Sequence, residues 1–316
     1  MIEVQKLSKS YGRIKAVDDI TFTVEKGEII GFLGPNGAGK STTMNMITGC
    51  LSSNGGSIKV CDNDVFDAPK EAKKHIGYLP EQPPLYTDLT VKEFLNFVSD
   101  LKKVDKKEKL EQMDEIMNLV KIKDVENRLI NNLSKGYKQR VGIAQALIGG
   151  PEVLILDEPT VGLDPKQMVE IRKLIKALGK EHTIILSSHI LPEVSAVCDR
   201  VIIINEGKIV AIDTPENLSR GTENLLNISI KIAGPEKAVQ TLLEDVEGVA
   251  KVEFVNSNKK KVESDFIIES EKDIDIRKPI FRALAAKDYP ILELKSLNLT
   301  LEDIFLKLTT QEKEVE

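Results

Sequence analysis

A glycine-rich loop near the start of the chain constrains the fold more than any other feature. It lies between an apolar run that ends at Leu33 and a segment of helical character that stops at Gly49. The loop fits G-x-x-x-x-G-K-[ST], and its residues are Gly34, Pro35, Asn36, Gly37, Ala38, Gly39, Lys40, Ser41 and Thr42. Glycines let backbone N–H groups converge on the β- and γ-phosphates of a nucleotide, and the following helix adds a favourable dipole. We therefore expect Lys40 to pair with phosphates and the Ser41 hydroxyl to ligate Mg²⁺.

An acidic pair follows another apolar run, at residues 153–156. The run is short and bounded by proline and acidic residues, which is typical of a buried parallel strand. The carboxyl ends of parallel strands line one crevice, so Asp157 would face the same nucleotide and hold Mg²⁺, usually through water. Glu158 would then polarise the attacking water. Alone, such a pair is as often a simple turn; beside a phosphate loop it indicates catalysis.

A third segment, at residues 133–140, precedes a run of helical character. Ser134 stands before a small turn containing Gly136, so a hydroxyl and exposed N–H groups could bind an anion. A plain helix N-cap would be the simpler interpretation if the segment stood alone.

Composition excludes several other classes of protein. The 316 residues carry a net charge of −6, which argues against a broadly basic face for nucleic acid. Three widely spaced cysteines, with no C-x-x-C pair, suggest neither a zinc site nor a disulfide framework. The amino terminus lacks the apolar stretch of a signal peptide, and no apolar run approaches the roughly 20 residues of a spanning helix. Any work at a membrane would therefore go through a partner.

The pattern of elements predicts two domains. Strand-like runs alternate with helical segments up to a break near residue 220, which predicts an α/β domain over residues 1–220 with a mainly parallel sheet. Within it, residues 88–150 are predicted as a helical subdomain, and the lysine-rich stretch 102–109 as a solvated connection. Residues 221–316 form a smaller α+β domain in βαββαβ order, the ferredoxin-like arrangement, followed by a helix at 300–310.

Together, the three motif segments resemble the Walker A, signature and Walker B motifs of ABC-type ATPases, and the resemblance covers residues 1 to about 220. It implies ATP and Mg²⁺ as cofactors and ATP hydrolysis as the reaction. The resemblance also implies four further roles: adenine stacking, sensing of Mg²⁺ and the membrane partner, coupling of two sites, and contact with the γ-phosphate. The matching residues are Tyr11, Gln82, Asp164 and His189.

The same resemblance implies an assembly. Two chains would pack head to tail as a homodimer, with each ATP held between Walker A of one chain and Ser134 and Gly136 of the other. The dimer would drive a separate integral membrane permease from the cytoplasmic face of the inner membrane, with residues 82–97 as the contact. No nucleic acid partner is expected.

One departure from the family pattern narrows the resemblance. The usual signature is LSGGQ, but here Lys135 replaces a glycine and Tyr137 replaces the glutamine. Signatures of this kind resemble those of a drug-exporter-like subgroup of bacterial ABC subunits, and within it the ATPases associated with gliding motility. This predicts an exporter, of unspecified substrate.

Two other classes of protein fit the sequence less well. Soluble ABC ATPases of translation or DNA repair usually carry two cassettes or long coiled coils, whereas one cassette and no sustained heptads are seen here. A P-loop kinase would have no use for the signature segment. The role of residues 221–316 stays open between a dimer brace, a regulatory domain and a partner contact.

Overall fold

The computed structural model describes residues 2–220, 227–258, 262–271 and 274–297. The chain forms two compact units, Met1–Pro215 and Glu216–Glu316, which divide close to the boundary expected at residue 220. Each unit is described by itself. The helix expected at 300–310 lies outside the described residues. No helix in the described part of the chain combines the length and the hydropathy needed to span a membrane.

A six-stranded sheet forms the centre of the first unit, in the order β10-β9-β3-β8-β7-β6. All neighbouring pairs are parallel except the one between β10 and β9. The strands are β3 (Ile29–Leu33), β6 (Ile76–Leu79), β7 (Val153–Asp157), β8 (Thr183–Ser188), β9 (Arg200–Asn205) and β10 (Lys208–Asp213). β3, β7 and β8 are buried along their whole length, which explains why they appear as continuous apolar runs in the sequence.

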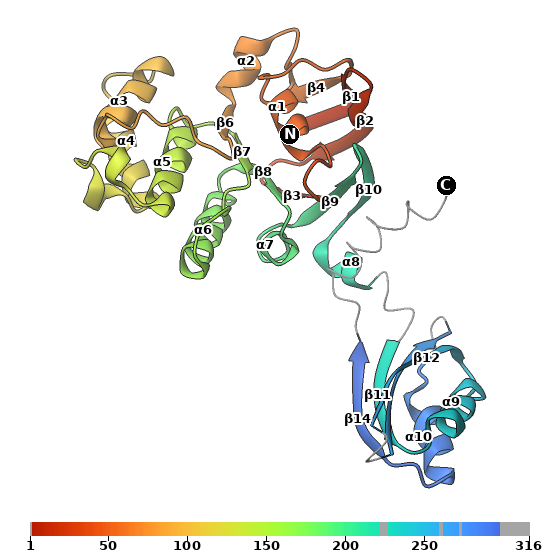
Figure 1. The fold of residues 1–316 in the computed structure, drawn as a ribbon. Helices are drawn as coiled ribbons and strands as arrows, with labels where there is room; N and C mark the ends of the chain where they lie inside the picture. Colours follow the sequence, from red (N-terminus) through yellow and green to blue (C-terminus); the bar gives the residue numbers. More distant parts are fainter. Residues whose placement is uncertain (1, 221–226, 259–261, 272–273, 298–316) are drawn as a thin grey trace. The chain divides into compact units, whose positions relative to one another are not determined.

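A second, antiparallel sheet packs beside the first and shares its apolar core (Figure 1). Its order is β2-β1-β4-β5, and the strands are β1 (Ile2–Tyr11), β2 (Ile14–Val24), β4 (Gly55–Val60) and β5 (Asn63–Asp64). Alternate residues of β1, such as Ile2 and Val4, are fully buried. The helices around the two sheets are α1 (Lys40–Ile47), α2 (Pro69–Lys74), α6 (Pro165–Leu178) and α7 (Leu191–Ser195). A further helix, α8 (Pro215–Arg220), begins where the two units divide.

Three helices gather at one side of the first unit: α3 (Val91–Leu101), α4 (Lys109–Leu119) and α5 (Lys135–Leu147) (Figure 1). Thr90 opens α3 with a capping box shared with Glu93. Two short 3₁₀ turns, η1 (Lys123–Val125) and η2 (Ile130–Asn132), connect α4 to α5. The prediction that residues 102–109 are solvated is wrong at the end of the stretch, because Lys109 is 9% exposed and its Nζ lies 2.7 Å from a carboxylate oxygen of Asp100.

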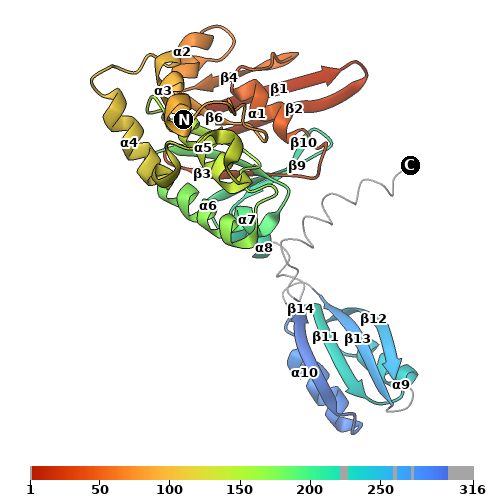
Figure 2. The same cartoon turned by 60° about the vertical axis from the view of Figure 1, so that its left-hand side comes forward.

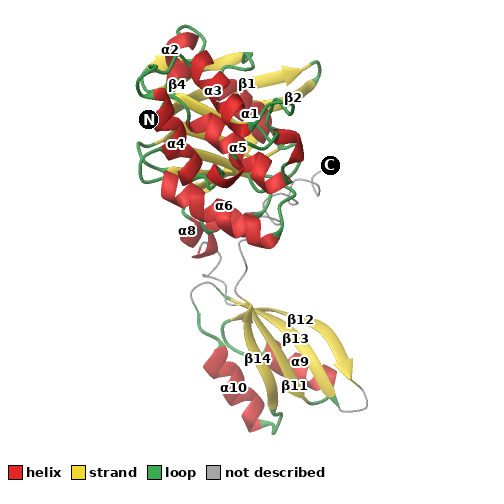
Figure 3. Ribbon diagram, turned by 90° about the vertical axis from the view of Figure 1, so that its left-hand side faces the viewer, coloured by secondary structure: helices red, strands yellow, loops and turns green. Residues whose placement is uncertain are grey.

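The second unit has the expected βαββαβ order. Its elements are β11 (Asn227–Ala233), α9 (Glu236–Glu244), β12 (Val249–Asn258), β13 (Glu263–Ser270), α10 (Arg277–Ala286) and β14 (Ile291–Leu297). The strands form one antiparallel sheet, β12-β13-β11-β14, with both helices on one face (Figures 2 and 3). The inward side chains of α9, α10 and β11 make a separate core, which includes Val239, Ile280 and Ile230.

Candidate nucleotide-binding site

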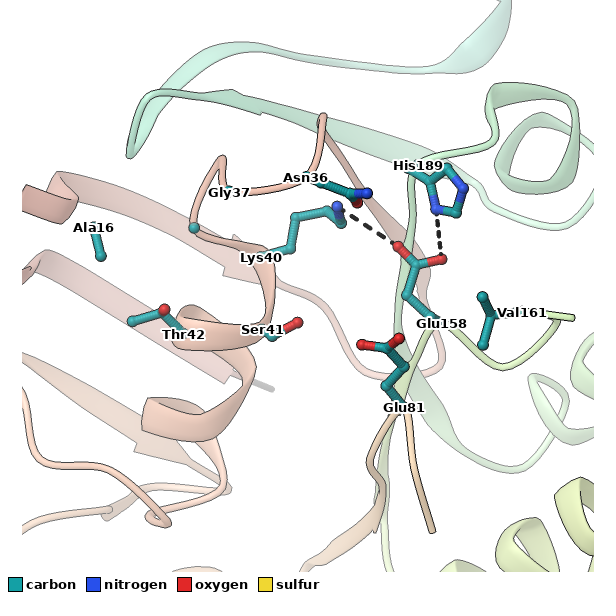
Figure 4. A pocket seen from close by; sticks show the side chains of 11 residues that line it. Ala16, Asn36, Gly37, Lys40, Ser41, Thr42, Glu81, Glu158, Val161 and His189 are labelled. Carbon is teal, nitrogen blue, oxygen red and sulfur yellow. Dashed lines mark hydrogen bonds and ion pairs between the residues drawn. The ribbon is translucent and has the colours of Figure 1, made fainter.

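A cavity of about 400 Å³ lies where β3, β7 and β8 end and α1 begins (Figure 4). Such a position, at the carboxyl ends of parallel strands, is where open α/β sheets bind ligands. The lining residues are Ala16, Asn36, Gly37, Gly39, Lys40, Ser41, Thr42, Glu81, Glu158, Val161 and His189. The structure thus brings most of the glycine-rich loop together with the acidic strand end and the predicted histidine.

The loop needs glycine at the residue that caps the start of α1. Gly39 has a φ of 107°, and an added Cβ would lie 2.4 Å from the carbonyl oxygen of Ala16. An L side chain would meet both backbone strain and a backbone clash there. The first N–H groups of a helix have no partner within it, so the start of α1 offers donors and a positive dipole end to the cavity.

Lys40 is held in the cavity by groups of the protein itself. Its Nζ donates to the carbonyl oxygens of Gly34 at 2.8 Å and Pro35 at 3.2 Å, and lies 3.6 Å from a carboxylate oxygen of Glu158. Lys40 and Glu158 are each 6% exposed. A buried ammonium requires such partners, because the desolvation of an unpaired charge is costly.

Asp157 is fixed from two sides. Ser41 Oγ donates to its Oδ1 at 3.3 Å, and Ser187 Oγ donates to the same oxygen at 2.5 Å. Burial raises the pKa of the nearby Tyr78 phenol, and the negative charge of Asp157 raises it further. Hydroxyl and carboxylate oxygens are the hard ligands that Mg²⁺ prefers, so this donor set fits the ion.

Glu158 combines an unusual backbone with a catalytic type of contact. Its φ of 48° is in the left-handed region, where a non-glycine residue carries strain that is typical of functional sites. The backbone N–H of Glu158 donates to Ser187 Oγ at 2.9 Å, and its Oε2 lies 3.0 Å from His189 Nδ1. A carboxylate oriented by a histidine beside a phosphate-binding lysine can align a water molecule for attack.

Known proteins are similar to this chain in sequence and in fold. A family model described as ABC transporter matches residues 17–161. The bacitracin transport ATP-binding protein BcrA of Bacillus licheniformis is 34% identical over 98% of this chain and 97% of its own length. The linearmycin resistance ATP-binding protein LnrL of Bacillus subtilis is 32% identical over 98% of each chain. A solved dimeric ATP-binding cassette, in a post-hydrolysis state with ADP and Pi, matches with a TM-score of 0.62 and 26% identity, over 68% of this chain and 98% of that one.

The chain belongs to the ABC transporter family. It is an ATP-binding subunit that hydrolyses ATP, so the predicted fold class, function and enzyme activity are confirmed. Subunits of this family generally dimerise and pair with a membrane permease.

The residues that the ABC resemblance places across a dimer do not line the cavity of their own chain. Ser134 caps α5 and accepts a hydrogen bond from the Tyr137 N–H at 3.4 Å, while Asp164 caps α6 and accepts from the Gln167 N–H at 2.9 Å. A Cβ on Gly136 would lie 2.7 Å from the Gln167 side chain. The signature and the Asp164 turn are therefore packed together on one side of the ABC cassette.

Two further expected residues also lie outside this cavity. Tyr11, at the end of β1, is 52% exposed, and its ring centroid is 5.7 Å from Lys9 Nζ. Gln82 and its neighbour Glu81 are both exposed, but only Glu81 is among the residues that line the cavity. The sequence analysis missed Glu81. The signal that could have identified it is its position in the sequence just after Leu79, where β6 ends.

The two departures in the ABC signature have structural partners. The Tyr137 hydroxyl donates to Asp124 Oδ2 at 2.8 Å, which joins α5 to η1. Lys135 Nζ lies against Gly162, so closely that a Cβ there would be 2.0 Å from it. Both side chains thus make contacts within their own chain.

A second group of ligand-type side chains lies apart from the cavity. Single ligand atoms of Cys61, His75 and Glu152 lie within 4.8 Å of one another. The residues come from three separate segments, so spacing in the sequence gave no sign of them. His75 Nδ1 and Glu152 Oε1 are 2.8 Å apart and form a hydrogen bond with each other. This hydrogen bond accounts for the proximity of the two side chains without a metal ion.

Proposed function

We propose that this ATPase works as a homodimer around two MgATP molecules and powers an exporter for antibiotic-like compounds. The convergence of Lys40, Glu158 and His189 on one cavity carries the catalytic part of the proposal. BcrA and LnrL are named for bacitracin transport and linearmycin resistance, which supports the class of substrate. Neither name supports the role in gliding motility that the signature suggested.

The contacts in the cavity support some of the proposed residue roles, and the ABC resemblance supports the roles of Tyr11 and Asp164. Lys40 and the loop N–H groups bind the β- and γ-phosphates, and Glu158 orients the attacking water as general base. His189 holds the Glu158 carboxylate and contacts the γ-phosphate. Tyr11 stacks on adenine, and Asp164 couples the two sites of the dimer.

Ser41 and Asp157 would hold Mg²⁺, which supplies positive charge against the developing negative charge of the transferred phosphoryl group. A third member from the segment after β6 completes the set. The sequence pattern names Gln82 for that position, but the lining of the cavity favours Glu81.

The dimer, the permease and the location are parts of one assembly. Ser134 and Gly136 lie away from the cavity of their own chain, so a second chain must bring them to the phosphates. The segment 82–97 contacts a membrane permease, which places the protein at the cytoplasmic face of the inner membrane. In this assembly residues 1–220 are the ATPase domain, 88–150 its helical subdomain, and 221–316 an accessory domain.

Glu158→Gln tests the catalytic assignment. The amide cannot accept a proton from water, so steady-state ATP hydrolysis should fall by at least about a hundredfold while ATP binding persists. With Mg²⁺ and ATP the variant should also form a stable dimer in size-exclusion chromatography.

Glu170→Gln is a matched control, because Glu170 pairs with Arg140 and does not line the cavity. It should hydrolyse ATP at the wild-type rate. Turnover by Glu158→Gln at the control's rate would refute the assignment.

A further inference from the structure

A second carboxylate lies behind the Glu158–His189 pair. Glu193, in α7, is 6% exposed although it is neither in the cavity lining nor in an ion pair with a described basic residue. Buried carboxylates are costly unless they are hydrogen-bonded, so its partners explain why it is tolerated.

Those partners are two hydroxyl groups from different segments of the chain. Thr160 Oγ1 donates a short hydrogen bond to Glu193 Oε2, and Ser188 Oγ donates to the same oxygen at 3.3 Å. Thr160 is 4% exposed and Ser188 is fully buried. One carboxylate oxygen therefore joins the loop that follows β7 to the last residue of β8.

The positions of the two hydroxyls give this bridge its meaning. Thr160 is two residues after Glu158, and Ser188 immediately precedes His189. Glu158 and His189, 3.0 Å apart, thus follow two strands whose ends are already joined through Ser187, and Glu193 adds a further link between the two segments. Ser188 Oγ also accepts from the N–H of Ile190, which fixes the backbone on the other side of His189.

The other carboxylate oxygen argues against a purely stabilising role. Glu193 Oε1 is buried and has no hydrogen-bond partner among the described residues. A half-satisfied buried carboxylate is less stable than an apolar side chain of similar size in the same place. Its presence is explained by what Oε2 holds in position.

We propose that Glu193 is a positioning residue, which sets the distance and orientation between Glu158 and His189 through Thr160 and Ser188. The proposal rests on the proposed catalytic roles of that pair. Loss of the bridge lets the two segments move apart, and small displacements of catalytic groups are costly to the chemical step. Binding of ATP, which depends on Lys40 and its loop, is spared.

The test uses four variants of the full chain: Thr160→Val, Thr160→Ser, Glu193→Gln and Thr183→Val. Thr160→Val removes the donated hydrogen bond and should lower kcat by about ten- to a hundredfold with little change in KM for ATP. Thr160→Ser restores the hydroxyl, and Glu193→Gln keeps an acceptor oxygen, so both should recover most of kcat.

Thr183→Val is the matched control. Thr183 is also a 4% exposed threonine of the first unit, but it lies at the opposite end of β8 and accepts from the Gly27 N–H. It should lower the melting temperature as much as Thr160→Val does and leave kcat unchanged.

Two results would overturn the proposal: a wild-type kcat in Thr160→Val, or a kcat in Thr160→Ser as low as in Thr160→Val. Glu158→Gln, measured alongside, keeps the two questions separate. If it still hydrolyses ATP, the catalytic assignment fails. If it is inactive while Thr160→Val is fully active, only the role of Glu193 fails.

Discussion

At the scale of single residues, Lys40 and Glu158 are paired inside the cavity. The ammonium lies 3.6 Å from the carboxylate and is also bound by two carbonyl oxygens. A phosphate that binds Lys40 replaces a negative partner that is already present. In the proposed mechanism the affinity for ATP is therefore a difference between two pairings of Lys40, and ATP binding would free Glu158 to contact water.

The segment after β6 yields a prediction at the same scale. Glu81 lines the cavity and Gln82 does not, so Glu81→Ala should raise the Mg²⁺ concentration needed for half-maximal ATP hydrolysis by about tenfold or more. Gln82→Ala should leave it nearly unchanged. Titration of hydrolysis with Mg²⁺ at saturating ATP measures both. A larger effect of Gln82→Ala would support the assignment made from the sequence motif.

The two neighbours also show what a sequence can predict about single residues. The cavity residues from the glycine-rich loop, together with Glu158, were predicted because their chemistry allows few residue types at fixed spacing. His189 was predicted only through the resemblance to ABC-type ATPases. Glu81 and Gln82 are both polar and follow the same strand, so only the backbone path decides which enters the cavity. Glu193 was missed because its partners, Thr160 and Ser188, lie far from one another in the sequence.

At the scale of elements, α5 is positioned by a close approach to β6. A Cβ on Gly142 would lie 2.6 Å from Leu79 Cδ1 and 3.0 Å from Pro83 Cγ. Leu79 is fully buried and cannot move aside cheaply. The approach sets the signature helix against the segment that carries Glu81.

Gly142→Ala tests this packing. Glycine to alanine in a free helix is stabilising by about 1 kcal/mol, whereas overpacking costs roughly 1–3 kcal/mol. We therefore expect a net loss of stability of the first unit, seen as a lower unfolding midpoint in denaturant. Gly55→Ala, where an added Cβ meets nothing within 4 Å, is the control. A variant more stable than this control would mean that the contact is slack.

The periodicity of apolar residues predicted helices and strands better than charge predicted which residues are exposed to solvent. The apolar face of α3, with Val91, Phe94 and Leu95, is buried as expected. The lysine-rich connection was misjudged because charge suggests solvent, while Lys109 is buried through its pairing with Asp100. The order of elements in residues 227–297 followed from alternating and helical patterns alone.

At the scale of the whole molecule, the proposed dimer predicts complementation between two inactive variants. Lys40→Ala should abolish ATP binding, while Ser134→Arg should bind ATP and fail to hydrolyse it. A one-to-one mixture can build one site from an intact phosphate loop and an intact signature, so some hydrolysis should return.

Each variant alone at doubled concentration is the control for this mixture. Loss of ATP binding in Ser134→Arg, as complete as in Lys40→Ala, would contradict a site shared between chains.

The strand order of the central sheet has a consequence for synthesis of the chain. β3 carries the phosphate loop, yet its neighbours β8 and β9 begin at Thr183 and Arg200, at least 150 residues later. At the usual speed of ribosomes that delay is roughly ten to thirty seconds. During it the loop has left the ribosome without the strands that hold its shape. The parallel pairing on both sides of β3 can therefore form only after translation has passed β9.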